Sequence, residues 1–195
     1  ALATDGRCKT LDYAADGYGR SEGVGSCLLS VENGNPCHGT LVYIGVNQDA
    51  RSSALVAPRG AAQSAVIAET CSRCVGQLTG YELHGTGTQL GDPIEIGALR
   101  EALECTTIDL VAISVTSVKA SFGHSEGSAG IAGLLSAIIS EKNRQRMPIN
   151  HLMHLNPHVA DVSNGSSTPR QFSFGRVLSA GVRINQRNGR GEHSG

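Results

Sequence analysis

The sequence predicts a layered α/β fold, because segments patterned as buried strands alternate with segments of helical period along its 195 residues. Apolar residues make up 39% of the chain, which is enough to build a core at this length. The 25 glycines cluster between the apolar segments and indicate a site shaped by closely approaching backbone. A net charge of −1 argues against a broadly basic nucleic-acid-binding protein. No apolar run approaches the roughly 20 residues needed to cross a bilayer.

The first half of the chain contains four predicted elements. Short apolar runs flanked by Gly, Asn and Pro predict buried strands at 23–31 and 41–46, joined by a turn-rich connection over 32–39. Apolar residues at helical spacing predict a helix over 59–75. A short strand over 78–83 follows and leads directly into the sequence HGTGT.

Asp92 and Pro93 predict the start of the next helix, with Asp92 as the N-cap and Pro93 at the first helical position. The β-branched run over 110–118 predicts a strand. After it, Ser125 or Ser128 is suited to cap a further helix. Small residues on that helix predict the close approach of another backbone: Gly127, Ala129, Gly130, Ala132 and Gly133.

The helical pattern weakens after residue 141, and the C-terminal part of the chain reads differently. Two prolines predict a loop over 147–159. Residues 183–195 form a Gly-, Arg- and Asn-rich tail without apolar periodicity.

The cysteines and a histidine run predict no metal site. Cys71 and Cys74 form a single C-x-x-C within a predicted helix, whereas a zinc site would require a second pair. His151, His154 and His158 have no carboxylate or thiol partner nearby in the sequence, so we interpret them as loop histidines. Without a secretory signal, the six cysteines are expected to be free thiols in a reducing compartment, either the cytoplasm or an organelle.

Two predicted strands each lead into a histidine embedded in Gly, Ser and Thr, namely His84 and His124. Ligand sites in α/β sheets collect at the carboxyl ends of strands, so the two imidazoles converge on one reacting atom if the strands are neighbours. A lone histidine is more often a satisfied core or surface group. The glycines beside both residues favour a functional role here.

These residues carry a family resemblance. The sequences HGTGTQLGDPIE at 84–95 and SVKASFGHSEGSAG at 117–130 resemble the two histidine motifs of β-ketoacyl synthases, the condensing domains of fatty acid and polyketide synthases. Residues 5–23 resemble the stretch that follows the active-site cysteine in that family. Residues 47–53 and 155–158 are similar to further segments of the polyketide synthase branch.

The resemblance implies a thiolase-like fold of stacked α-β-α-β-α layers. The chain would supply the end of the first half and most of the second, with a partial synthase domain over 1–182 and a divergent tail over 183–195. The implied activity is decarboxylative Claisen condensation of acyl and malonyl thioesters in polyketide or fatty acid biosynthesis. The implied partners are an acyl carrier protein and a second subunit. No cofactor of its own is implied, because the phosphopantetheine arm belongs to the carrier protein.

The same resemblance assigns roles to six residues. His84 and His124 correspond to the two active-site histidines, Lys119 to the buried lysine, and Glu95 to the acid that pairs with this lysine. Thr86 and Thr88 correspond to hydroxyls that bind phosphopantetheine. The alternative for both threonines is turn and helix-cap chemistry.

The family's nucleophilic cysteine lies upstream of Asp5 in the family pattern, and none of the six cysteines takes its place. Cys8 is flanked by Arg7 and Lys9, which would lower the pKa of a thiol. The resemblance nevertheless places Cys8 on a loop after the nucleophile. The phenylalanine-containing segment typical of the family is also missing from 183–191. We therefore keep open an inactive synthase fragment or remnant and, more weakly, a thiolase relative that uses coenzyme A esters.

Overall fold

The centre of the molecule is a parallel sheet. The computed structural model describes residues 1–31, 37–48, 60–73, 78–106, 113–164 and 172–174. In this part of the chain the strand order is β1-β2-β3. The strands are β1 (Gly80–Glu82), β2 (Ile113–Thr116) and β3 (Phe172–Phe174). The register pairs Glu82 with Thr116, so β1 and β2 end side by side.

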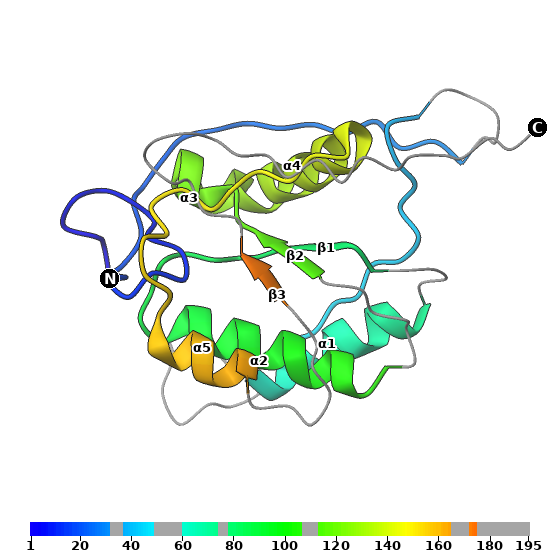
Figure 1. The fold of residues 1–195 in the computed structure, drawn as a ribbon. Helices are drawn as coiled ribbons and strands as arrows, with labels where there is room; N and C mark the ends of the chain where they lie inside the picture. Colours follow the sequence, from blue (N-terminus) through cyan, green and yellow to red (C-terminus); the bar gives the residue numbers. More distant parts are fainter. Residues whose placement is uncertain (32–36, 49–59, 74–77, 107–112, 165–171, 175–195) are drawn as a thin grey trace, which may run out of the picture.

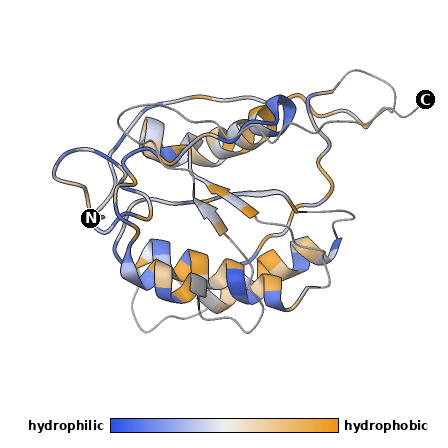
Figure 2. Cartoon of the chain, viewed as in Figure 1, coloured by the Kyte–Doolittle hydropathy of each residue, from blue (hydrophilic) through white to orange (hydrophobic). Residues whose placement is uncertain are grey.

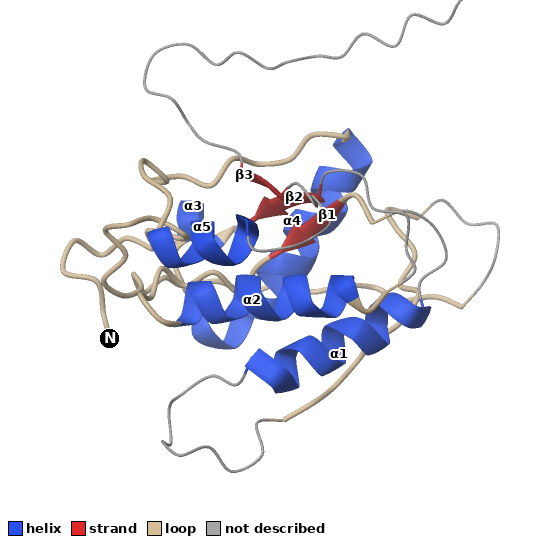
Figure 3. Ribbon diagram, turned by 60° about the horizontal axis from the view of Figure 1, so that its bottom comes forward, coloured by secondary structure: helices blue, strands red, loops and turns tan. Residues whose placement is uncertain are grey.

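Helices cover both faces of the sheet (Figure 1). On one face lie α3 (Lys119–Phe122), the short 3₁₀ helix η1 (Glu126–Ser128) and α4 (Ala129–Asn143). On the other face lie α1 (Gly60–Arg73), α2 (Gly91–Glu104) and α5 (Pro157–Asn164). Helix α2 packs against both α1 and α5 (Figure 3). The result is a helix–sheet–helix sandwich.

The core forms where α2 meets the sheet. Ile96, Leu99 and Leu103 recur at helical spacing and are fully buried, and Figure 2 shows apolar and polar residues on different sides of this helix. They share one apolar cluster with Ile113 and Val115, which point inward from β2. Helix α2 therefore packs its apolar side against the sheet.

The predicted elements of the central region are confirmed, with two corrections at helix starts. Helix α2 begins at Gly91, and Asp92 lies inside it rather than at its N-cap. The cap is made instead by Thr88, whose Oγ1 accepts the Gly91 N–H at 3.1 Å. Neither Ser125 nor Ser128 caps a helix through its side chain, because η1 leads into α4 and supplies its first turn.

The close backbone approach predicted for the small residues of η1 and α4 is wrong for Gly127 in η1 and Gly130 in α4. A side-chain carbon placed on Gly127 or Gly130 would meet no atom within 4 Å. On Gly133 it would lie at an ordinary contact distance of 3.6 Å from Cγ of Glu82. This face of α4 is therefore not pressed against another backbone in the described part of the chain.

The strands predicted at 23–31 and 41–46 are wrong. Both segments are extended but belong to no strand, and Figure 1 shows the first running over α4. Val24, Leu28 and Val31 are 98–99% exposed. A short apolar run suits a strand, but a ladder also requires a neighbouring strand, and the described residues place none beside these segments.

Two C-terminal elements escaped prediction. The segment 147–159 reads as a loop, yet α5 begins within it at Pro157. The sequence Asn156-Pro157 is a typical helix start. In the structure Pro157 occupies the first helical position, and the Asn156 side chain accepts the His158 N–H at 3.0 Å. Strand β3 spans only three residues, too few to show a period.

The turn over 32–36, Cys74 and the tail at 183–195 lie outside the described residues. Within the described part, no helix is long and apolar enough to cross a membrane.

The burial pattern predicts how two leucines differ in their contribution to stability. Replacing the fully buried Leu99 with Ala should lower the free energy of unfolding by about 2–5 kcal/mol, because a cavity opens between α2 and the sheet. Replacing Leu28, which is 98% exposed, should change it by no more than about 0.5 kcal/mol. Urea unfolding followed by circular dichroism measures both, and equal losses would contradict the described burial.

Candidate active site

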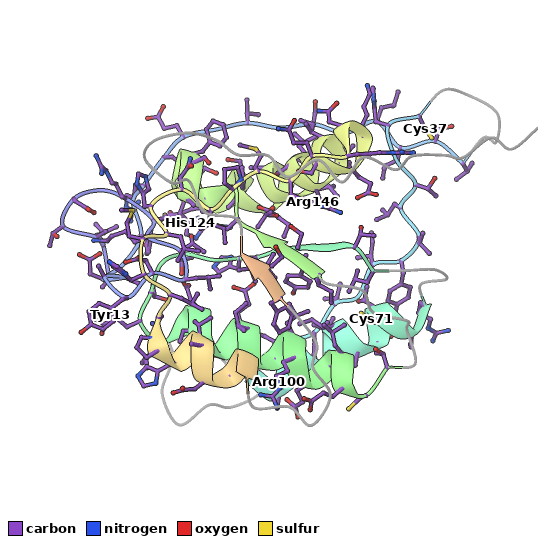
Figure 4. All side chains as sticks on the ribbon, in the orientation of Figure 1. Tyr13, Cys37, Cys71, Arg100, His124 and Arg146 are labelled. Carbon is purple, nitrogen blue, oxygen red and sulfur yellow. The ribbon has the colours of Figure 1, made fainter. Side chains whose placement is uncertain are left out.

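The candidate site lies beyond the carboxyl ends of β1 and β2. His84 follows β1, while Lys119 opens α3 just after β2, and His124 follows α3. Figure 4 shows His124 on the side of the molecule where the N-terminal loop lies. Neighbouring parallel strands thus deliver both histidines to one edge of the sheet.

The two imidazole rings meet. The ring centroids of His84 and His124 are 5.3 Å apart, and the rings are nearly perpendicular at 87°. The predicted proximity of the two histidines is therefore confirmed, while their action on one reacting atom stays a prediction. The ring of Tyr18 lies 5.1 Å from that of His124 and packs against it. Sequence reasoning missed Tyr18, because nothing in a loop sequence shows which ring it will contact.

The backbone of His84 is held by a buried carboxylate. Glu95 accepts the N–H of His84 at 2.6 Å and that of Gly85 at 2.9 Å, one on each oxygen. The carbonyl of Gly85 in turn accepts the hydroxyls of Thr10 at 2.6 Å and Ser117 at 3.3 Å. Gly85 has a φ of +44°, a conformation that residues with a side chain rarely adopt. The turn after His84 is thereby fixed in one shape.

A second buried carboxylate, Asp92, joins this turn to the N-terminal loop. It accepts the N–H of Leu11 at 2.7 Å and that of Gly87 at 3.2 Å. Sequence reasoning treated Asp92 as a helix cap. Its real role could be recognised only once the fold brought Leu11 beside it.

The backbone of His124 is held by the loop around Gly19. The N–H of His124 donates to the Gly19 carbonyl at 2.7 Å, and the Ser21 N–H donates to the His124 carbonyl at 3.1 Å. Gly123, just before the histidine, has a φ of +81° that favours glycine. The N-terminal loop therefore positions both histidines.

A backbone contact selects the tautomer of His124. The N–H of Glu126 donates to Nδ1 of His124 at 3.1 Å. Nδ1 is then an acceptor, so the proton of the neutral ring sits on Nε2. This leaves Nε2–H free to donate to a ligand.

Both imidazoles are held in the neutral form at pH 7. Partial burial lowers the pKa of His84 to about 4, and the positive charge of Lys119 and the neighbouring His124 act in the same direction. The pKa of His124 is also lowered, first by burial and then by Lys119. Neutral rings serve as hydrogen-bond donors without adding positive charge.

Lys119 is 4% exposed and lies between acidic side chains. Burial lowers its pKa, while the negative charges of Glu95 and Glu82 oppose this effect. The direct ion pair predicted between Lys119 and Glu95 is not formed. Both oxygens of Glu95 are taken by the N–H groups of His84 and Gly85, so the two charges interact through space.

The two buried carboxyls also have shifted pKa values. Burial raises the pKa of Glu95 to about 7 and that of Asp92 to about 6, although both accept backbone N–H groups that favour the charged form. The site therefore keeps its acidic groups close to their titration points at neutral pH.

The two threonines of the turn lie next to the histidine and contact each other. Thr86 is 8% exposed, and its hydroxyl lies 3.3 Å from that of Thr88. Thr88 also caps α2, so the cap chemistry considered for it is present.

Cys8 is buried against the loop that holds His124. Its Sγ accepts the Gly19 N–H at 3.3 Å. Burial raises the pKa of the Cys8 thiol, which overturns the expectation that Arg7 and Lys9 would lower it. Both neighbours point toward other groups or solvent: Lys9 pairs with Asp16 at 2.7 Å, and Arg7 is exposed.

In the described part of the chain, no group of three or more metal-binding side chains is close enough to hold an ion. His151, His154 and His158 are all exposed there.

Comparison with known proteins places this site in a family. The family model for the C-terminal domain of beta-ketoacyl synthase matches residues 38–153, which include both histidines. The chain belongs to the β-ketoacyl synthase family. Its helices and parallel strands are accordingly part of the thiolase-like α/β fold of ketosynthases.

Three similar proteins illustrate the relationship. NorA′, a spectinabilin polyketide synthase system protein of Streptomyces orinoci, is 38% identical over 174 residues, covering 85% of this chain and 5% of that protein. Erythronolide synthase EryA3 of Saccharopolyspora erythraea is 36% identical over 166 residues, covering 81% of this chain and 5% of that protein. The oxazolomycin ketosynthase domain OzmH KS7 of Streptomyces albus JA3453 superimposes with a TM-score of 0.71 at 28% identity, covering 90% of this chain and 30% of that chain. The chain thus spans a small part of these relatives.

The lowered pKa values predict the charge of the ketosynthase histidines in solution. His84 should remain neutral from pH 8 down to pH 5 and titrate at about pH 4, because burial and Lys119 disfavour its cation. Imidazole NMR titration measures this, with His84→Gln and His124→Gln used to assign the signals. A His84 midpoint near its ordinary value of 6.5 would contradict the described environment.

Proposed function

We propose that this chain provides the enolate-forming part of a ketosynthase that condenses acyl and malonyl thioesters in polyketide synthesis. The observation that carries the proposal is the pair of neutral imidazoles 5.3 Å apart, one of them fixed with its proton on Nε2. NorA′ carries a polyketide synthase name, which supports polyketide rather than fatty acid synthesis as the setting.

In the first step, a malonyl thioester loses carbon dioxide. The bond between its α-carbon and carboxylate carbon breaks, and the electron pair moves through the α-carbon onto the thioester oxygen. We propose that Nε2–H of His124 and the ring of His84 stabilise this oxyanion, which the short distance between the two rings supports. Both rings begin neutral, so they form no ion pair with the malonyl carboxylate. They therefore do not bind the substrate more tightly than the enolate, and their hydrogen bonds can lower the barrier.

In the second step, the enolate carbon attacks the carbonyl of an acyl thioester. A carbon–carbon bond forms, the tetrahedral intermediate collapses, and the thiolate leaves. The raised pKa of Cys8 makes this thiol a poor acyl carrier, so we propose that the acyl group is held by a thiol other than Cys8. This chain's own contribution is then to the decarboxylation step.

We propose an acyl carrier protein as the partner that delivers the thioester on its phosphopantetheine arm. The hydroxyls of Thr86 and Thr88 lie in the turn directly after His84, where they would hydrogen-bond to that arm. No cofactor of the chain's own is required for this chemistry. The complete ketosynthase would act as a homodimer, as the resemblance implies.

Removing either histidine tests the proposal. His84→Ala and His124→Ala should each lower the rate of malonyl-thioester decarboxylation by about 10²–10³-fold, because each removes one oxyanion donor. Release of carbon dioxide from a malonyl-pantetheine thioester measures the rate. His154→Ala, an exposed histidine away from the site, should leave the rate unchanged.

Near wild-type rates in both site variants would overturn the assignment of the two histidines. A wild-type chain without measurable decarboxylation would support the alternative of an inactive synthase fragment.

A further inference from the structure

A third acidic residue, Glu82, stands at the junction of the elements that carry the site. It is the last residue of β1, two positions before His84, and lies opposite Thr116 in the β1–β2 register. Its side chain is half-buried between the sheet and α4. Apart from the effect of its charge on Lys119, none of the roles described above uses it.

The Glu82 carboxylate binds donors from two other elements. One oxygen accepts the Thr116 hydroxyl at 2.6 Å and the Ser136 hydroxyl of α4 at 3.5 Å. The other oxygen accepts the backbone N–H of Val118. A carboxylate with three donors is held in one orientation, and hydrogen bonds to a charged group are the stronger kind.

The bond to Val118 has a specific consequence for the site. Val118 is the N-cap residue of α3, whose first residue is Lys119 and whose end leads through Gly123 to His124. Glu82 therefore fixes the start of α3, the short helix that determines the positions of Lys119 and His124. The same residue fixes the end of the strand that leads to His84.

Charge adds a second link. Glu82 acts on Lys119 as a negative partner, together with Glu95. Glu95 holds the His84 backbone through its two oxygens, whereas Glu82 holds the Lys119 side of the site. The two carboxylates thus act on Lys119 from two different elements, Glu82 from β1 and Glu95 from α2.

We propose that Glu82 is a positioning residue that sets the distance between the two histidine-bearing segments and supplies Lys119 with a second negative partner. Its importance for catalysis rests on the proposed function, but its effect on the geometry of the site does not. Glu82 would act through Val118, Thr116 and Lys119, without touching substrate.

The test uses the full chain with Glu82→Gln, which keeps the size of the side chain but removes its charge and one acceptor. NMR follows two structural readouts: the titration midpoint of Lys119 and the contact between the His84 and His124 rings. The Lys119 midpoint should fall, because a negative partner is lost, and the ring contact should weaken. Glu101→Gln, an exposed glutamate on α2, should change neither.

Activity gives a third readout. Malonyl-thioester decarboxylation should fall on the order of 10²-fold in Glu82→Gln if the two rings lose their mutual placement. Thr116→Val keeps the charge and removes one donor, so it should weaken the ring contact and lower the rate about tenfold. The Thr116→Val variant should leave the titration midpoint of Lys119 unchanged.

An unchanged Lys119 midpoint together with an unchanged ring contact in Glu82→Gln would overturn the proposal. If that variant fails to fold, a Thr116→Val chain with a wild-type ring contact overturns it instead. A wild-type chain that does not decarboxylate would count against the proposed function alone, because the two NMR readouts would still decide the role of Glu82.

Discussion

The hydrogen bonds from the His84 and Gly85 backbone to the buried Glu95 carboxylate are the interaction on which the rest of the site depends. They join the end of β1 to the first turns of α2, so the His84 side chain is carried by backbone that is held in place. Asp92, three residues earlier on the same helix, does the same for Gly87 and for the N-terminal loop. That loop then holds His124 through Gly19.

This arrangement makes stability depend on pH in two opposing ways. Because burial raises the pKa of Glu95 to about 7 and of Asp92 to about 6, the folded state binds their protons more tightly than the unfolded chain. The stabilisation from these protons is lost as pH rises from about 4 toward those values. His84, with a pKa lowered to about 4, has the opposite sign: the unfolded chain gains protons first as pH falls below 6.5. The site is therefore balanced by groups whose contributions partly cancel between about pH 4 and 6.5.

The sequence predicted structure best where a feature depends on residues that are close together in the chain. The helical spacing of Ile94, Ala98, Leu99 and Ala102 predicts α2. The two strands that lead to His84 and His124 predict that the rings meet if the strands are neighbours, and the structure places these strands side by side. The sequence predicted structure least well where a feature depends on a contact between residues that are far apart in the chain. Whether Asp92 caps its helix or binds Leu11 depends on a contact across 81 residues. The short apolar run over 23–31 shows the same limit, since such a run indicates a preference for a strand that only a neighbouring strand can satisfy.

The central claim is that His84 and His124 act as paired neutral donors to one thioester oxygen. Its most direct measurement is the ¹⁵N NMR spectrum of both imidazoles during titration with a non-hydrolysable malonyl-pantetheine analogue at pH 7. The geometry predicts that both rings start neutral, that His124 carries its proton on Nε2, and that both rings respond together at one ligand concentration. A response from one ring alone, or a His124 proton on Nδ1, would contradict it.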